Sequence, residues 1–460
     1  MRSLCGVHRE HERRGLMFAR SANPAFKPDY GSPGNAAGWP SPRRGWFTVA
    51  VFFVTAILSY TDRLIFSLLV DPVRSSLGIS DFQVGLAQGT SFAIIYAVAG
   101  LPAGRLADIA NRGNLLLLGL VIWSAGTVAC GFAAGMTSLM GARIFVAAGE
   151  AILAPAAISM ISDMFPPERR GRPMAVFLSG MNVGSGLAIV IGGGVLSLAQ
   201  SGAFDGLGLG HFAPWRTTLV LIGLLGAPVL ALLLLVREPQ RRAGHALAKR
   251  SLKAVLGELS GSWRRVLPII AGLAALATVD FALISWVPSL LVRDFGVPSW
   301  EVSNGFGLVI LISGCLGTLV GGVAADRLFA RGGNALRLRV AAALALSGGL
   351  AMVFLPVSSP EFVVAISGFW LFVSAAATVC GITTAQDVVP ADAKGLCISF
   401  MAMGNISLGL GIGASLPGAL AGGGNDTDSG LGWAIAVVAV PLALLALSLF
   451  AASNRGSKVH

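Results

Sequence analysis

Long apolar stretches alternate with short polar segments along most of this chain. Twelve of the stretches reach the length of about 20 residues that a helix needs to cross a bilayer. They cover approximately residues 46–70, 83–107, 114–134, 138–163, 173–200, 215–236, 266–292, 302–325, 337–357, 361–386, 395–421 and 431–452. The pattern therefore predicts an all-α membrane protein with twelve transmembrane helices.

The composition agrees with this prediction and excludes several other classes of protein. Of the 460 residues, 55% are hydrophobic and 12% are charged, whereas a soluble domain has about 25% charged residues. The cysteines form no Cys-x-x-Cys pair, so neither a disulfide framework nor a zinc site is expected. No lysine stands in Gly-Lys-Ser/Thr, so the chain has no P-loop for ATP hydrolysis. We expect no metal, no cofactor and no enzymatic activity.

The basic residues are distributed unevenly between the two sides of the predicted membrane. Arg74, Arg216 and Arg293 lie on one side, and Arg63 and Arg143 lie inside spans. The others among the 33 Lys and Arg residues lie on the side that holds both termini. By the positive-inside rule, both termini are predicted to be cytoplasmic, in a multi-pass protein of the cell (inner) membrane. The net charge of +11 is thus a topology signal, and no nucleic-acid partner is expected.

Polar segments divide the chain into five parts. Residues 1–45 and 454–460 are predicted to be cytoplasmic tails, the first of them disordered. In residues 237–265, apolar residues recur at helical spacing among basic ones, which is typical of an amphipathic helix on the membrane surface. This linker separates two predicted six-helix bundles, residues 46–236 and 266–453.

The two halves of the chain repeat one another. Asp108 and Asp326 stand in similar loops after the second and eighth spans, 218 residues apart. Asp62 in the first span and Asp280 in the seventh have the same separation. Such a duplication is typical of an alternating-access transporter, in which two similar bundles rock about a site at their interface.

Charged loops recur at matching places in both halves. The run Asp163–Gly171 matches the run Asp387–Gly395 at an offset of 224 residues. Charge pairing near helix ends can hold one side of such a transporter closed. We therefore predict a cytoplasmic gate made by Asp108, Arg112, Asp163, Glu168, Arg169, Arg170, Asp326, Arg327 and Asp387. The alternative is that these are solvated loop charges.

Five charged residues lie inside predicted spans, where each charge costs several kcal/mol. Asp62 and Arg63 are adjacent, Arg143 and Glu150 are two helical turns apart, and Asp280 lies in span seven. Burial disfavours an ionised carboxylate and a nearby Arg favours it, so such a group can exchange a proton when its neighbours change. We predict that the three carboxylates couple transport to protons and that the two arginines bind an anionic substrate. Ion pairs that only fix helix packing are the alternative.

These motifs resemble those of the major facilitator superfamily over residues 46–452. The loop Gly104–Arg112 is similar to the motif that the superfamily carries between its second and third spans. The runs Tyr60–Arg63, Arg143–Ala151 and Ser162–Gly171, together with Trp286-Val-Pro288, resemble the Spinster-like branch. Animal members of that branch are associated with lysophospholipid and sphingolipid-phosphate transport. The organic-anion symporter branch also uses Asp-Arg in span one and Glu in span four.

The resemblance implies the major facilitator fold, with two pseudo-symmetric six-helix bundles. It also implies a secondary active transporter, here predicted to be a monomer that moves an amphipathic, lysolipid-like organic anion with protons across the lipid bilayer. Tyr60, Trp286 and Trp370 would then contribute to the substrate site. A symporter of small organic anions such as sugar acids is one alternative, and a membrane receptor or sensor that does not transport is another.

Overall fold

The computed structural model describes residues 39–166, 169, 171–208, 210–241, 252–389, 394–421 and 430–455. In this part of the chain, eleven helices are long and apolar enough to cross a membrane. One of them, Ser299–Val357, contains two predicted spans, and its helix is interrupted at Gly332 and Gly333. Each of the twelve predicted spans thus has a helical counterpart, so the predicted all-α, multi-pass architecture is confirmed.

The helices of the first half surround a core that contains α2. They are α2 (Pro42–Ile65), η1 (Phe66–Leu68), α3 (Val70–Leu77), α4 (Asp81–Gly85), η2 (Leu86–Thr90), α5 (Ser91–Ile109), α6 (Arg112–Gly131), α7 (Met136–Glu150), α8 (Leu153–Met164), α9 (Gly171–Gln200), α10 (Pro214–Leu224) and α11 (Gly226–Leu234). The second span is continuous through α4, η2 and α5, with η2 wound as a π-helix. The fourth span is made by α7 and α8, which are separated by a turn directly after Glu150.

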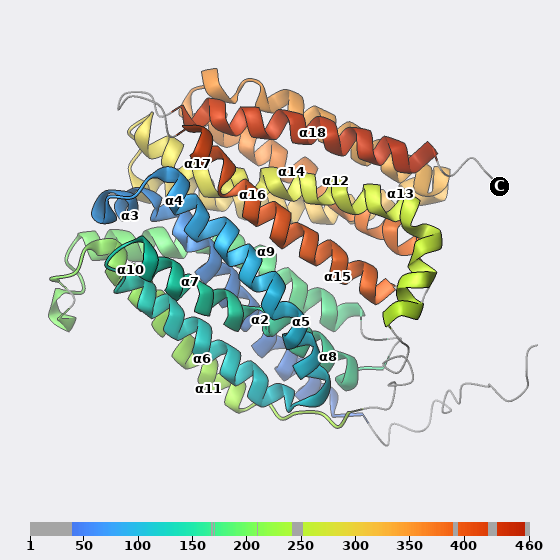
Figure 1. The fold of residues 1–460 in the computed structure, drawn as a ribbon, viewed down its shortest axis with the longest axis horizontal. Helices are drawn as coiled ribbons and strands as arrows, with labels where there is room; N and C mark the ends of the chain where they lie inside the picture. The colour runs from blue at the N-terminus through green and yellow to red at the C-terminus, as the bar shows by residue number, and fades with distance from the viewer. Residues whose placement is uncertain are drawn as a thin grey trace, which may run out of the picture. The chain divides into compact units, whose positions relative to one another are not determined.

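The second half is built on the same plan with longer helices. They are α12 (Leu252–Arg293), α13 (Ser299–Met352), η5 (Leu355–Val357), α14 (Pro360–Val388), α15 (Lys394–Gly404), η7 (Asn405–Leu410), α16 (Gly411–Gly413), α17 (Leu416–Ala421) and α18 (Leu431–Arg455). In Figure 1 the blue-to-green helices of the first half and the yellow-to-red helices of the second half form two groups. Like η2 in the second span, η7 in the eleventh span is a π-helix.

Part of the predicted linker, residues 237–265, belongs to the helix of span seven, because α12 begins at Leu252. Residues 242–251 and the side chains of 252–262 lie outside the described part, so its amphipathic character stays a prediction. The disorder of the first tail stays a prediction for residues 1–38, which are not described, as are residues 456–460. The predicted end of that tail at residue 45 is too late, because α2 begins at Pro42.

Glycines allow the helices of each bundle to approach closely. A methyl group on Gly184 of α9 would lie 2.7 Å from the carbonyl oxygen of Ile57 in α2. In the second bundle, a methyl group on Gly321 of α13 would lie 2.6 Å from the Cα of Ala376 in α14. Small residues at helix contacts are typical of membrane proteins, in which close van der Waals packing drives helix association.

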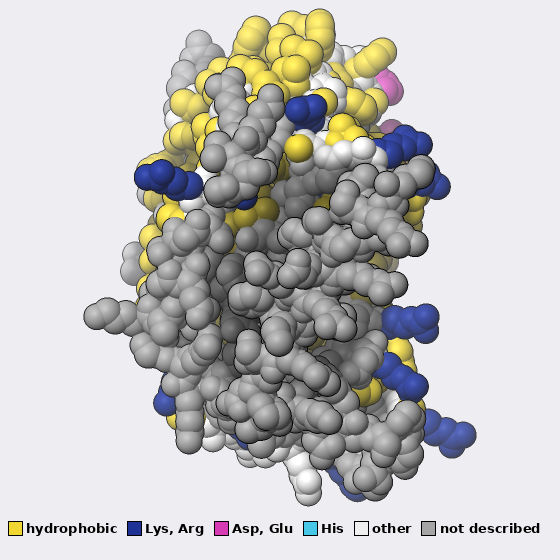
Figure 2. Space-filling view, turned by 90° about the vertical axis from the view of Figure 1, so that its right-hand side faces the viewer, with side chains coloured by type: hydrophobic (Ala, Val, Ile, Leu, Met, Phe, Trp, Pro, Cys, Tyr) yellow, Lys and Arg dark blue, Asp and Glu magenta, His cyan; other side chains and the backbone are white. Residues whose placement is uncertain are grey.

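The two ends of the helix assembly are distinguished by where the chain enters and leaves it. At the termini end, α2 begins and α18 ends; at the Arg293 end, α12 ends at Arg293. Figure 2 shows the termini end, with Lys and Arg side chains at several places and fewer Asp and Glu side chains among the described residues. This agrees with the predicted charge bias, while the cytoplasmic position of the termini stays a prediction.

Candidate functional site

A charged cluster lies buried in the first bundle, where α2 meets the end of α7. Arg63 and Glu150 are 2% and 1% exposed. Their side chains form an ion pair, in which Nη2 and Nε of Arg63 donate to Oε2 of Glu150 at 2.5 and 3.1 Å. The hydroxyl of Ser59, one turn before Arg63, donates to the same oxygen at 3.0 Å. The structure thus brings together two of the residues that we predicted to act at the site.

Aromatic rings surround the Arg63 guanidinium. Its carbon lies 4.6 Å from the ring centre of Tyr60, 4.9 Å from that of Phe92 and 5.2 Å from that of Tyr96. These distances allow cation–π attraction, which keeps the cation in place after it has left water. Among the described residues, Arg63 Nη1 and Glu150 Oε1 are buried without a hydrogen-bond partner. One donor atom and one acceptor atom of the pair are therefore unused.

Asp62 faces a different neighbour from Arg63, as expected for adjacent residues that diverge by about 100° around a helix. Asp62 is 2% exposed, and its Oδ2 accepts a hydrogen bond of 2.5 Å from the hydroxyl of Thr127 in α6. Its Oδ1 is buried without a partner among the described residues. The carboxylate is therefore held by a neutral donor and makes no ion pair in the described part of the chain.

Arg143 binds backbone carbonyls instead of a carboxylate. Its Nε and Nη2 donate to the carbonyl oxygens of Ala87 and Gln88 at 3.3 and 3.4 Å. Both carbonyls belong to η2, and a π-helix disturbs the regular backbone bonding of an α-helix and often occurs at functional sites. The rings of Phe66 and Phe92 each lie 5.2 Å from the guanidinium. The alternative of an Arg143–carboxylate pair is not observed among the described residues.

Gln88 is a site residue that the sequence prediction missed. Its side-chain Nε2 donates to the hydroxyl of Ser285 in α12 at 3.2 Å, so it joins the first bundle to the second. Its Oε1 is buried without a partner in the described part of the chain. The available signal was an amide side chain well inside a mostly apolar span.

The carboxylate of the second bundle, Asp280, has neutral partners. The indole N–H of Trp370 donates to Oδ1 at 2.7 Å, and the hydroxyl of Ser374 donates to Oδ2 at 3.0 Å. Trp370 and Trp286 are both fully buried. The indole of Trp286 donates to the carbonyl oxygen of Ala414 at 2.9 Å. Both predicted substrate-site tryptophans therefore make internal contacts in this conformation.

The predicted gate residues form pairs within each bundle. Arg112 is 1% exposed, and it binds Asp163 at 2.5 Å and Glu238 at 2.9 Å. In the second bundle Arg337 binds Asp387 at 2.6 Å. The two arginines are 225 residues apart and their aspartates 224, so the repeat extends to this pair. Arg337 was missed because the sequence offered it only as one more loop charge.

The other predicted gate residues make no such pairs in the described part of the chain. Arg169, Asp326 and Arg327 are exposed, and their side chains make no hydrogen bond or ion pair to another described residue. Glu168, Arg170 and the side chain of Asp108 lie outside the described part. Between two described residues, no hydrogen bond or ion pair joins the bundles at the termini end.

A second charged cluster, also missed, joins the two bundles at the Arg293 end. Arg293 donates to both carboxylate oxygens of Asp81 at 2.7 and 2.8 Å, and through Nε it binds Asp71. Arg74 lies 3.5 Å from Asp81. Asp81 is 5% exposed, whereas Arg74 is 43% exposed. The partners of Arg293 are 212 and 222 residues away along the chain, so spacing gave no signal for this cluster.

Close helix contacts accompany the Arg293 cluster. The hydroxyl of Thr90 bonds to the hydroxyl of Ser415 at 2.7 Å and to the carbonyl oxygen of Gly411 at 2.8 Å. A methyl group on Gly85 would lie 2.6 Å from the carbonyl oxygen of Ala414, and one on Gly186 would lie 2.5 Å from Cβ of Leu311. The bundles are therefore closed against each other at the Arg293 end.

Comparison with known proteins agrees with this architecture. Residues 51–414 match the sequence model of the Major Facilitator Superfamily. An MFS-type efflux pump of Mycolicibacterium smegmatis is 32% identical over 329 residues, which are 70% of each chain. Protein spinster of Drosophila melanogaster is 28% identical over 61% of this chain and 45% of its own length, so the chain spans about half of that relative.

A solved structure shows the same fold. The crystal structure of a bacterial homolog to the human lysosomal transporter Spinster, inward-facing and unoccupied, is similar to this chain with a TM-score of 0.76. The two are 24% identical, and the similarity covers 90% of this chain and 98% of that one. The predicted resemblance to Spinster-like proteins is confirmed.

Proposed function

The chain belongs to the major facilitator superfamily of membrane transporters, and we propose that it is a proton-coupled secondary active transporter of an amphipathic organic anion. It is a multi-pass membrane protein and not an enzyme. The observation that carries the proposal is the buried Arg63–Glu150 pair, in which Arg63 Nη1 and Glu150 Oε1 have no partner among the described residues. A buried cation with a free donor is suited to an anionic substrate.

Binding and proton uptake follow from competition for Arg63. An anionic headgroup first meets the free Nη1 and then replaces Glu150 Oε2 at Nη2 and Nε. Glu150 then lies in a low-dielectric site without its cation, where the protonated form is favoured. Release of the anion lets Arg63 attract the carboxylate again, and the proton leaves. Substrate and proton thus bind together and leave together.

Two further carboxylates are candidates for protonation. Asp62 accepts from Thr127 and Asp280 from Trp370 and Ser374, which are neutral donors. A buried ionised carboxylate with only neutral donors is costly, so each is suited to carry a proton during part of the cycle. Arg143, whose partners are carbonyls, supplies a second positive charge to the anion.

Alternating access supplies the route for a substrate bound between the bundles. The closed contacts lie at the Arg293 end, and no bond between described residues joins the bundles at the termini end. With the termini in the cytoplasm, this conformation is inward-facing. Opening to the other side requires that Arg293 separates from Asp71 and Asp81. The mechanism requires a single copy of the chain, so we propose a monomer in the cell (inner) membrane.

Uptake into proteoliposomes tests the proposal. A pH gradient should drive accumulation of dodecyl phosphate in the wild type. Glu150→Gln should abolish the accumulation and retain binding, because Gln keeps the volume and Arg63 remains. Glu361→Gln, at an exposed glutamate near the start of α14, is the matched control and should behave like the wild type. No response of the wild type to the pH gradient would refute proton coupling.

The same vesicles distinguish the alternative substrate class. Glucuronate, a sugar acid without an apolar chain, should neither accumulate nor compete with dodecyl phosphate. Glucuronate accumulation that depends on Arg63, with no uptake of dodecyl phosphate, would favour the symporter of small organic anions instead.

A further inference from the structure

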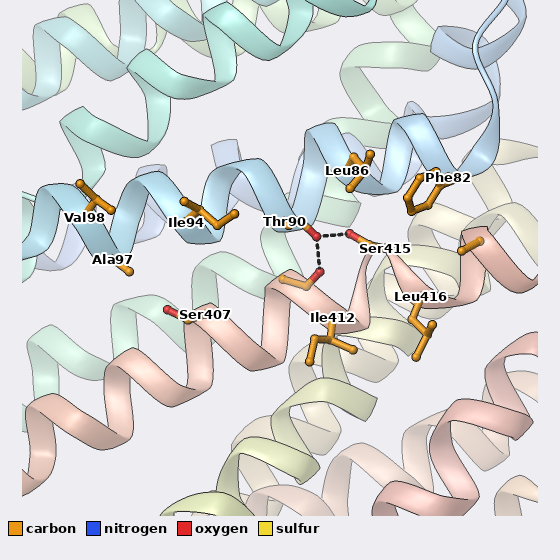
Figure 3. Close-up of a pocket in the computed structure, with 12 residues that line it drawn as sticks. Phe82, Leu86, Thr90, Ile94, Ala97, Val98, Ser407, Ile412, Ser415 and Leu416 are labelled. Atoms are coloured by element: carbon orange, nitrogen blue, oxygen red, sulfur yellow. Dashed lines mark hydrogen bonds between the residues drawn. The ribbon is translucent and has the colours of Figure 1, made fainter.

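An apolar groove of about 480 Å³ runs between the second span of the first bundle and the eleventh span of the second bundle (Figure 3). Its first wall includes Ile94, Ala97 and Val98 of α5, and its second wall includes Ile412 and Leu416. Figure 3 shows the two helices in contact at Thr90 and Ser415 and farther apart toward Val98 and Ser407. The groove therefore widens from the closed contacts toward the termini end.

The groove opens to the surroundings of the helices, where the bilayer interior lies. Val98 is 64% exposed, Ile94 56% and Ile412 42%. Both walls belong to helices that are long and apolar enough to span the membrane, and none of the described residues that line the groove is charged. The environment of this surface is hydrocarbon, so its occupant is an apolar chain.

The hydroxyl groups at the contact point are already satisfied. The hydroxyl of Thr90 lies 2.8 Å from the carbonyl oxygen of Gly411, and that of Ser415 lies 2.9 Å from the carbonyl oxygen of Gly85. The two hydroxyl oxygens are 2.7 Å apart, so their two protons serve two of these three contacts at a time. Thr90 is the last residue of the π-helix η2, and Gly411 directly follows the π-helix η7. π-Helices often occur at functional sites. The polar atoms at the contact join the helices. Elsewhere in the lining, Ser407 adds a hydroxyl that is buried without a hydrogen-bond partner among the described residues, and the remaining side chains are apolar.

One stretch of α5 contacts the buried Arg63 and also lines the groove. Phe92 and Tyr96 face Arg63. Two residues beyond each of them, Ile94 and Val98 line the groove. Two residues correspond to about 200° around a helix, so the two sets occupy opposite faces. An anion at Arg63 and a chain in the groove are separated only by the width of α5, about 10 Å.

We propose that this groove holds the hydrocarbon chain of the transported molecule while its anionic headgroup binds at Arg63. The inference rests on the proposed function and adds to it the place where the apolar chain of the substrate lies. The chain passes between the bundles toward the termini end, and its tail remains in contact with the bilayer during binding.

Chain length is the variable that tests this inference. Butyl, dodecyl and hexadecyl monophosphate carry the same headgroup, and their apparent affinities are measured by competition with labelled dodecyl phosphate in lipid nanodiscs. Ala97→Trp places an indole in the groove. It should weaken the binding of hexadecyl phosphate by about tenfold, because most contacts of the long chain are lost. The affinity for butyl phosphate should stay unchanged. Leu118→Trp is the matched control at another exposed site, on α6, and should change neither.

The possible outcomes test the groove assignment and the anion-site assignment separately. Both assignments are supported if Arg63→Ala abolishes the binding of all three phosphates and if affinity depends less on chain length in Ala97→Trp than in the wild type. If the phosphates depend on Arg63 but Ala97→Trp leaves the chain-length dependence unchanged, the groove assignment is wrong and the proposed function stands. If butyl phosphate binds equally well without Arg63, the anion site itself is wrong and the groove assignment falls with it.

Photolabelling provides an independent measurement. Hexadecyl phosphate with a diazirine at the end of its chain should label residues 94–98 and 407–419, and excess unlabelled hexadecyl phosphate should prevent this. Labelling that spreads over all lipid-facing helices and resists competition would show ordinary bilayer contact and overturn the inference.

Discussion

The two ends of the molecule use ion pairs in different ways. At the Arg293 end, one arginine of the second bundle binds two aspartates of the first bundle. At the termini end, Arg112 and Arg337 each bind an aspartate within their own bundle. Pairs that cross the interface must break when that end opens, whereas pairs inside a bundle can persist through the whole cycle.

The two kinds of ion pair are therefore expected to have different roles: pairs between the bundles control opening, and pairs within a bundle keep it rigid. The termini-end pairs recur in both bundles at nearly one offset, so they belong to the duplicated scaffold and hold each bundle together as a unit. The Arg293 cluster has no such symmetry, because one bundle supplies the aspartates and the other supplies the arginine. We therefore expect substitutions at Arg293 to shift the balance between conformations, and substitutions at Arg112 or Arg337 to lower stability.

The largest expected effect on conformation is that of Arg293→Ala. The substitution removes the ion pairs that join the bundles at this end and leaves Asp71 and Asp81 without the arginine that they share. We expect the population open at the Arg293 end to rise by about tenfold or more. Spin labels on cysteines at Ser76 and Phe295, in a background without other cysteines, should report longer distances by electron–electron resonance.

Arg293→Lys is the matched control for that substitution. Lysine keeps the charge but cannot reproduce the two parallel bonds to Asp81, so an intermediate shift is expected. Distances that are the same in Arg293→Ala and in the unsubstituted protein would show that the close helix contacts alone hold this end closed.

The sequence was sufficient for the architecture because its signals are local. Each span is a continuous apolar run, and the duplication is visible as matched motifs at one offset. The buried charges, such as Arg63 and Glu150, were also evident, because a charge inside a span is conspicuous wherever its partner lies.

The pairing of those charges could not be predicted, because it depends on how distant spans meet. Arg63 and Glu150 are 87 residues apart, and Arg293 and Asp81 are 212 apart. The partner of Arg143 was further concealed because it is backbone. The carbonyls of Ala87 and Gln88 that it binds belong to the π-helical turn η2, and hydrophobicity patterns carry no information about such a turn.

Arg112→Ala should act on stability rather than on conformation. Arg112 is almost fully buried and joins Asp163 to Glu238, so its loss leaves two acidic groups near each other without their shared cation. Breaking a buried pair costs roughly 3–5 kcal/mol. The midpoint of thermal unfolding in detergent should fall clearly, while the spin-label distances at the Arg293 end stay constant.

Arg337→Ala should destabilise the protein less than Arg112→Ala does. Its carboxylate partner, Asp387, is 40% exposed and can be solvated by water after the substitution. Arg337 also donates to the carbonyl oxygen of Ala325 at 2.8 Å, and that bond is lost as well. We expect a cost of about 1–2 kcal/mol. An unfolding midpoint lower than that of Arg112→Ala would contradict the claim that burial determines the difference.

The smallest effect is expected for Arg74→Ala, which tests the Arg293 cluster from its exposed side. Arg74 approaches the same carboxylate as Arg293, but it lies 3.5 Å away, is 43% exposed and belongs to the same bundle as Asp81. Exposed pairs of this kind contribute about 0–1 kcal/mol. Removing Arg74 leaves the bonds between the bundles intact, so neither the unfolding midpoint nor the spin-label distances should change measurably. If Arg74→Ala opened the Arg293 end as far as Arg293→Ala does, total charge around Asp81 would control the closure, and the crossing of the interface by Arg293 would have no special role.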